Sequence, residues 1–185
     1  MKKNREMILI ALFAALTAIG AFIQIPLWFY PVPMTLQTLF VFFAGFCLSP
    51  KAAAYSQLVY ILLGLIGIPI FTKGGGIHYV TDLTFGYLLA FIITAPLLSI
   101  VVRKFLSHRQ NKAVFALSVL GILLLMEAIG IAYMALISGL YLDVPLTPQR
   151  AFYLFAVFLP LDIVKCAASL AISLQLKKRL PFLRA

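Results

Sequence analysis

Six long apolar segments divide this sequence, and they constrain its fold more than any other feature. They cover residues 7–24, 39–48, 52–71, 83–102, 114–139 and 151–176. A helix needs about 20 apolar residues to cross a bilayer, and every segment except the second approaches that length. Only 11% of the residues are charged, too few to cover the outside of a soluble domain. The sequence therefore predicts an all-α integral membrane protein with six transmembrane helices, formed by residues 1–185 as a single domain.

Basic residues indicate how the predicted helices cross the membrane. If the helices alternate in direction, the two termini and the loops after the second and fourth segments share one side, which holds twelve Lys and Arg residues. The other side holds Lys73 and Arg150, and Lys165 lies within a predicted helix. Cytoplasmic loops are enriched in basic residues, so both termini are predicted to be cytoplasmic. The net charge of +10 comes from basic residues in these termini and loops, so we do not expect a nucleic-acid partner.

The predicted outer loops are rich in residues that fix non-helical backbone. Prolines recur in residues 25–36 and 141–148, and three consecutive glycines occur at 74–76. The second segment is short unless it begins within residues 35–38, so we expect an irregular outer end there. Such backbone is tolerated at membrane depth where protein covers it or where it lines a cavity. These segments are therefore either plain surface loops or a structured cap over an outward-facing pocket.

Two ionisable residues lie near the middle of the last predicted helix. Asp162 is eleven residues from Ala151, about 17 Å along the helix, and Lys165 follows it by three residues. This spacing places both side chains on one face, where their charges offset each other. An unpaired charge at this depth costs roughly 2.5–3.5 kcal/mol. The two residues are either an ion pair kept for packing or a polar binding point at the floor of a pocket, and we favour the binding point.

Two further features lie inside predicted helices. Glu127 has no basic neighbour in its own segment, so it is either neutral and hydrogen-bonded to another helix or turned toward the pocket. Small residues recur four apart in the first helix, at Ala11 and Ala15 and at Ala14 and Ala18. This spacing permits close approach of another helix, and internal packing explains it equally well.

The sequence lacks the motifs of several activities. No His, Cys and carboxylate residues have the spacing of metal ligands, the glycines at 74–76 are not part of a P-loop, and there is no nucleophile elbow. We therefore expect no metal, no cofactor, no ATPase activity in this chain and no enzyme function. A small membrane protein with a pocket and no energy source is expected to be a subunit of a larger assembly.

Six short motifs resemble BioY, the biotin-specific S-component family of energy-coupling-factor (ECF) transporters. They are 31–38 (PVPMTLQT), 48–51 (LSPK), 60–69 (YILLGLIGIP), 74–76 (GGG), 84–87 (TFGY) and 158–165 (FLPLDIVK). The likeness covers nearly the whole chain. The sequence departs from the family at Leu161, where a glycine is usual, and at Leu83 and Ala132, where prolines are usual.

The resemblance implies the S-component fold, with substrate held under the outer loops and both termini inside. It implies a location in the plasma membrane of a prokaryote and three partner subunits, a transmembrane coupling protein and two cytoplasmic ATPases. In that family the alanine motif of the first helix contacts the coupling protein, which by position falls on Ala11 and Ala15. The Asp-x-x-Lys motif belongs to the biotin site and falls on Asp162 and Lys165.

The chemistry of biotin suits such a site. Asp162 accepts a ureido N–H and Lys165 donates to the ureido carbonyl in the pose that we favour, and the reverse pose places Lys165 on the biotin carboxylate. The apolar ring is expected to pack on aromatic side chains and the carboxylate to meet loop amides near the outer rim. The residues predicted for these contacts are Trp28, Phe71, Tyr87, Gly74, Gly75, Gly76 and Gln37. The alternatives are an S-component for another vitamin, a membrane enzyme that uses Glu127 or His78, and a structural subunit.

Overall fold

The computed structural model describes residues 2–26, 32–108, 111–141 and 145–179, and these form an almost entirely helical protein. The elements are α1 (Lys2–Phe22), β1 (Gln24–Ile25), β2 (Met34–Thr35), α2 (Gln37–Cys47), α3 (Pro50–Leu65), the 3-10 helix η1 (Ile77–Thr81), α4 (Phe85–His108), α5 (Lys112–Tyr141) and α6 (Pro148–Arg179). The prediction of an all-α fold with six helices is confirmed.

Four of the six helices have the length and composition of a membrane span. α1, α4, α5 and α6 contain 21, 24, 30 and 32 residues, and each includes an apolar stretch long enough to cross a bilayer. α2 and α3 contain 11 and 16 residues. Membrane passage of these two shorter helices and the cytoplasmic placement of the termini remain predictions.

The third helix is shorter than its apolar segment predicted. Residues 52–71 suggested a helix of spanning length, but α3 ends at Leu65. Gly67 then adopts a φ of +109°, which residues with a side chain rarely adopt, and Pro69 cannot donate a helical hydrogen bond. The apolar residues 66–71 therefore form a turn. Hydrophobicity alone does not distinguish such a turn from a further helical turn.

The second helix begins within residues 35–38, where the sequence predicted its earliest possible start. It runs from Gln37 to Cys47, and β2 ends two residues before it. β1 and β2 pair as a short antiparallel sheet in which Gln24 lies opposite Thr35. The expected irregular start of this segment is confirmed, and its position on the outer side of the membrane remains a prediction.

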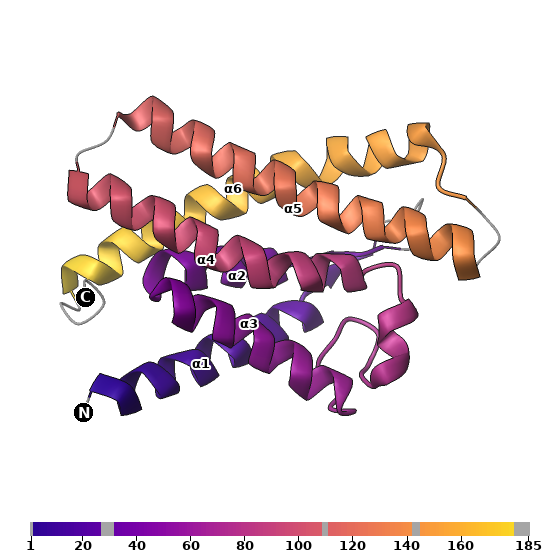
Figure 1. Ribbon diagram of the computed structural model, residues 1–185, viewed down its shortest axis with the longest axis horizontal. Coiled ribbons are helices and arrows are strands. Elements are labelled where there is room, and N and C mark those ends of the chain that lie inside the picture. Colours follow the sequence, from indigo (N-terminus) through magenta and orange to yellow (C-terminus); the bar gives the residue numbers. More distant parts are fainter. Residues whose placement is uncertain (1, 27–31, 109–110, 142–144, 180–185) are drawn as a thin grey trace.

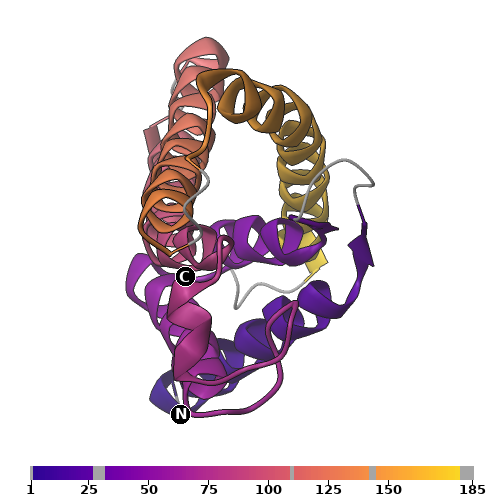
Figure 2. The same cartoon turned by 90° about the vertical axis from the view of Figure 1, so that its right-hand side faces the viewer.

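The helices are arranged around α2, which packs against α1, α4 and α6. Figure 2 shows α5 and α6 on one side of α2, and α1 and α3 on the other. Figure 1 shows the start of α1 and the end of α6 at the end of the molecule where α4 finishes and α5 begins, and the sheet and η1 near the opposite end. The irregular segments thus gather at the end predicted to face outward, around the residues that form the site.

Candidate ligand-binding site

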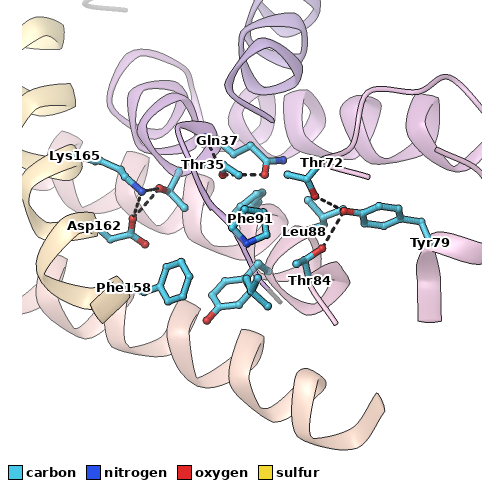
Figure 3. Close-up of a pocket in the computed structure, with 14 residues that line it drawn as sticks. Thr35, Gln37, Thr72, Tyr79, Thr84, Leu88, Phe91, Phe158, Asp162 and Lys165 are labelled. Carbon is cyan, nitrogen blue, oxygen red and sulfur yellow. Dashed lines mark hydrogen bonds and ion pairs between the residues drawn. The ribbon is translucent and has the colours of Figure 1, made fainter. Parts of the chain in front are cut away.

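A small cavity lies among α2, α4, α6 and the irregular segments beside them, with a volume of about 40 Å³. It is lined by Val32, Pro33, Thr35, Gln37, Thr38, Thr72, Tyr79, Thr84, Tyr87, Leu88, Phe91, Phe158, Asp162 and Lys165. Figure 3 shows an ionic group at one side, a group of hydroxyls at the other, and the apolar side chains of Leu88, Phe91 and Phe158 between them. Across the cavity, the site therefore changes from polar to apolar and back to polar.

The ionic group consists of Asp162, Lys165 and Thr38. Lys165 Nζ lies 2.9 Å from Asp162 Oδ1, and it also donates to Thr38 Oγ1 at 2.9 Å. The Thr38 hydroxyl in turn donates to Asp162 Oδ1 at 2.8 Å. Asp162 is only 2% exposed, so its charge depends on the lysine and the hydroxyl for compensation. The ion pair predicted from the helical spacing is present, and it faces the cavity.

A cluster of three hydroxyl-bearing side chains, Thr72, Tyr79 and Thr84, lies at the other side of the cavity and is called the hydroxyl cluster below. The Tyr79 hydroxyl lies 2.6 Å from Thr72 Oγ1 and 3.0 Å from Thr84 Oγ1. These three side chains come from η1 and from the segments that flank it. They offer neutral donors and acceptors without a fixed charge, which suits a ligand end that is hydrated or anionic.

Asp82 fixes the position of this hydroxyl cluster. Its Oδ1 accepts the backbone N–H of Thr84 at 2.9 Å and the Thr84 hydroxyl at 2.7 Å, and its Oδ2 pairs with Lys73 at 3.0 Å. Burial by itself raises the pKa of Asp82, but the bonds from Thr84 and Lys73 outweigh burial and hold that pKa below its ordinary value. The ionised carboxylate therefore stabilises the segment that carries Thr84.

The lowered pKa of Asp82 predicts how the stability of this segment depends on pH. Because the folded-state pKa is below the unfolded one, the stabilisation is complete above about pH 4 and is lost as the pH falls through the folded-state pKa. We expect Asp82→Asn to lower the midpoint of thermal unfolding at about pH 6, and to lower it much less at about pH 3. A difference that stayed constant between these two pH values would contradict the assignment.

Two of the predicted contact residues, Tyr87 and Gln37, line the cavity. The ring of Tyr87 lies near that of Phe158, with 6.2 Å between centroids. Gln37 is 5% exposed, and its amide is already engaged, since Nε2 donates to the Tyr60 hydroxyl at 2.7 Å and Oε1 accepts from Thr35. Both residues form walls of the cavity, and their contact with a ligand remains a prediction.

Phe71, another predicted contact residue, does not line the cavity. Its side chain is 1% exposed and packs against Tyr60 and Tyr79, with ring centroids 5.4 and 4.5 Å away. It therefore supports Tyr79 from behind, and its contact with a ligand remains a prediction. Trp28, also predicted to pack on the ligand ring, lies outside the described residues.

The three consecutive glycines also lie outside the lining of the cavity and serve the backbone. Gly74 and Gly76 have φ of +112° and +109°. A Cβ on Gly75 would approach the carbonyl oxygen of Ile68 to 2.2 Å. This segment therefore needs glycine in order to fold against the end of α3. The predicted binding of a ligand by its backbone amides remains a prediction.

The predicted docking residues lie on the outer face of α1. Ala11 and Ala15 are exposed, whereas Ala14 is 4% exposed and packs in the core. Of the two small-residue pairs in the sequence, only the first is thus available to another protein. Its role in docking remains a prediction.

Several residues of the site were not found by sequence reasoning. Thr38 completes the ionic group, yet it lies 124 residues from Asp162 and nothing in the sequence relates their depths. Phe158 lies one helical turn before Asp162 and therefore on the same face, a signal that would have indicated it. The hydroxyls of Thr72 and Thr84 meet that of Tyr79 because the segments before and after η1 both return to it, which residue type alone does not indicate.

The fold and the cavity define a helical integral membrane protein built to bind a small molecule with polar ends. The sequence profile described as the BioY family matches residues 1–182, so the chain belongs to the BioY family. The probable biotin transporter BioY of Pyrococcus horikoshii is 36% identical over 95% of this chain and 98% of its own length. The probable biotin transporter BioY of Bacillus subtilis is 34% identical over 97% of this chain and 94% of its own length.

A solved structure resembles the whole fold. It is the crystal structure of the S-component for biotin from an ECF-type ABC transporter, with a TM-score of 0.80 and 26% identity. The match covers 95% of this chain and 92% of that chain. The predicted S-component fold is confirmed, and the named relatives are transporters, not enzymes.

Proposed function

We propose that this chain is the biotin-capturing subunit of an ECF-type transporter in the plasma membrane of a prokaryote. The observation that carries the proposal is the buried ion pair of Asp162 and Lys165 facing a cavity, in a chain of the BioY family. Relatives over nearly the whole length are named biotin transporters, and the matching structure is a biotin S-component.

The ionic group suits the neutral ureido head of biotin. Asp162 accepts a ureido N–H while Lys165 donates to the ureido carbonyl, and both hydrogen bonds are assisted by charge. A neutral head leaves the balance of the ion pair intact, whereas a carboxylate there would compete with Asp162 for the lysine. The apolar ring then packs on Leu88, Phe91 and Phe158, which lie between the two polar groups (Figure 3).

The hydroxyl cluster of Thr72, Tyr79 and Thr84 suits the carboxylate tail of biotin. With the head at Lys165, the carboxylate tail extends toward Thr72, Tyr79 and Thr84. The Thr84 hydroxyl keeps its hydrogen bond to Asp82, and the O–H of Thr72 or Tyr79 turns to donate to the tail. The reverse pose places the carboxylate on Lys165 instead. Biotin amide distinguishes the two, because removing the charge of the tail weakens binding strongly only in the reverse pose.

Biotin must widen the cavity in order to bind. Ligand sites commonly enclose about 300–1,000 Å³, whereas this cavity has about 40 Å³. The segments over the cavity, which include β2 and η1, are short and irregular. We infer that biotin enters from this end, that the segments separate to admit it, and that they close over it.

The remaining parts of the proposal concern orientation and partners. Both termini are cytoplasmic, the cavity faces outward, and a transmembrane coupling protein docks on the face of α1 that carries Ala11 and Ala15. Two cytoplasmic ATPases supply the energy. The basic residues at the end of the molecule that holds the termini support this orientation, since cytoplasmic segments are enriched in them (Figure 1).

A calorimetric titration of the purified protein tests the proposal. We expect biotin to bind with a dissociation constant in the nanomolar range, which corresponds to about 12 kcal/mol, and one molecule to bind per chain. Thiamine and riboflavin serve as matched controls and should release no heat. Binding of another vitamin in place of biotin would refute the assigned substrate while leaving the transporter class intact.

A further inference from the structure

A buried carboxyl group of α5 lies next to the proposed biotin site. Glu127 is 0% exposed, although no residue of α5 is among the described residues that line the cavity. Its Oε2 accepts the hydroxyl of Tyr87 at 2.9 Å. Tyr87 is a wall of the cavity, so Glu127 reaches the site through that side chain.

The Tyr87 ring is seated on α5 at a second point. A Cβ placed on Gly130 would lie 2.5 Å from Tyr87 Cε1, so only a glycine leaves room for the ring there. Gly130 thus leaves room for one edge of the ring whose hydroxyl Glu127 accepts. On its other side, this ring lies near Phe158 of α6.

Glu127 also lies beside the ionic group. Asp162 and Lys165 both act on it electrostatically. Its Oε1 is buried and has no hydrogen-bond partner among the described residues. Two carboxyl groups therefore share one ammonium group in a membrane-embedded site, and the charges cancel only if one carboxyl carries a proton.

The hydrogen bonds decide which carboxyl that is. Asp162 Oδ1 accepts from both Lys165 and Thr38, an arrangement that suits a carboxylate. Among the described residues, Glu127 receives a single hydrogen bond, which comes from the neutral phenol of Tyr87. An O–H on Glu127 Oε1 would satisfy the orphaned oxygen by donating to Asp162, and it would remove the uncompensated charge.

We propose that Glu127 is a positioning residue of the ligand site, a neutral carboxylic acid that accepts the Tyr87 hydroxyl through Oε2 and donates its own proton from Oε1 to Asp162. In this arrangement Glu127 ties α4 and α6 to α5 at the level of the ligand. It fixes the Tyr87 wall and leaves the ion pair of Asp162 and Lys165 balanced. The expected effect of Glu127 on biotin binding rests on the proposed function. The protonated state of Glu127 does not depend on that function.

Substitution of Glu127 separates positioning from simple packing. Glutamine keeps an acceptor for Tyr87 and an N–H donor for Asp162, so Glu127→Gln should weaken biotin binding by less than about threefold. Leucine keeps the volume but leaves both partners unsatisfied, so Glu127→Leu should weaken it by about 10- to 100-fold. Met126→Leu, at a fully buried neighbour on α5, is the matched control and should bind like the wild type.

Difference infrared spectroscopy tests the proton without any ligand. The wild-type spectrum minus that of Glu127→Gln should show the carbonyl stretch of a protonated carboxylic acid at neutral pH. Absence of this band, or a loss of affinity in Glu127→Gln as large as in Glu127→Leu, would overturn the inference. If the band is present but the wild type binds no biotin, the proposed function fails and the protonated Glu127 stands.

Discussion

Replacing Lys165 with alanine is expected to weaken biotin binding by at least about a hundredfold, because it leaves one member of a buried ion pair without its partner. Asp162 is 2% exposed, and its Oδ1 accepts hydrogen bonds from Lys165 and Thr38. Breaking a buried pair typically costs about 3–5 kcal/mol, and the donor to the ureido carbonyl is lost as well. Asp162→Asn keeps an acceptor and should weaken binding less. Calorimetric titration of the purified variants measures both effects.

A double substitution separates binding from folding. Asp162→Asn combined with Lys165→Met removes both charges, so it should unfold at a higher temperature than Lys165→Ala alone and still fail to bind biotin. Lys112→Ala is the matched control, because Lys112 is an exposed lysine at the start of α5 and does not line the cavity. Wild-type affinity in a folded Lys165→Ala protein would remove the pair from the site.

A tryptophan at Ala11 or Ala15 is expected to abolish ATP-driven biotin uptake while the isolated protein keeps its affinity. Both alanines are exposed on α1, and close approach of a partner helix depends on small side chains. Neither residue lines the cavity, so a bulky side chain there does not reach the ligand. Uptake by cells that also produce the coupling protein and the ATPases, together with titration of the purified variants, tests both parts of the expectation.

The chain provides a matched control for this experiment. Ala128 and Ala132 are also four residues apart and exposed, but they lie on α5. Ala128→Trp and Ala132→Trp should leave uptake unchanged. Normal uptake in Ala11→Trp and Ala15→Trp would assign these two positions to contact with lipid, and equal loss in all four variants would show that the assay reports bulk instead of docking.

The helical parts of the site could be predicted from the sequence because helical spacing is regular. Asp162 and Lys165 are three residues apart in an apolar helix, and that spacing alone places their side chains together. The exposed position of Ala11 relative to the buried Ala14 could not be predicted in the same way. Which face of a membrane helix meets lipid depends on its neighbours, and both faces of α1 are apolar.

The irregular parts of the site could not be predicted, for two physical reasons. The glycines at 74–76 form a motif of the family and Phe71 lies beside it, but the backbone after α3 turns Phe71 into the core and uses the glycines for its own conformation. Thr38 reaches Asp162 and Glu127 reaches Tyr87 from other helices, and contact between helices far apart in sequence is set by tertiary packing. Hydropathy reports on depth in the membrane and not on which helices are neighbours.

Mass spectrometry of the protein purified from cells grown with biotin tests the central claim most directly. The account predicts a complex with the mass of one biotin per wild-type chain, release of biotin when the protein is denatured, and no biotin in Lys165→Ala. Folded wild-type protein that carries no biotin, and binds none when biotin is added, would contradict it.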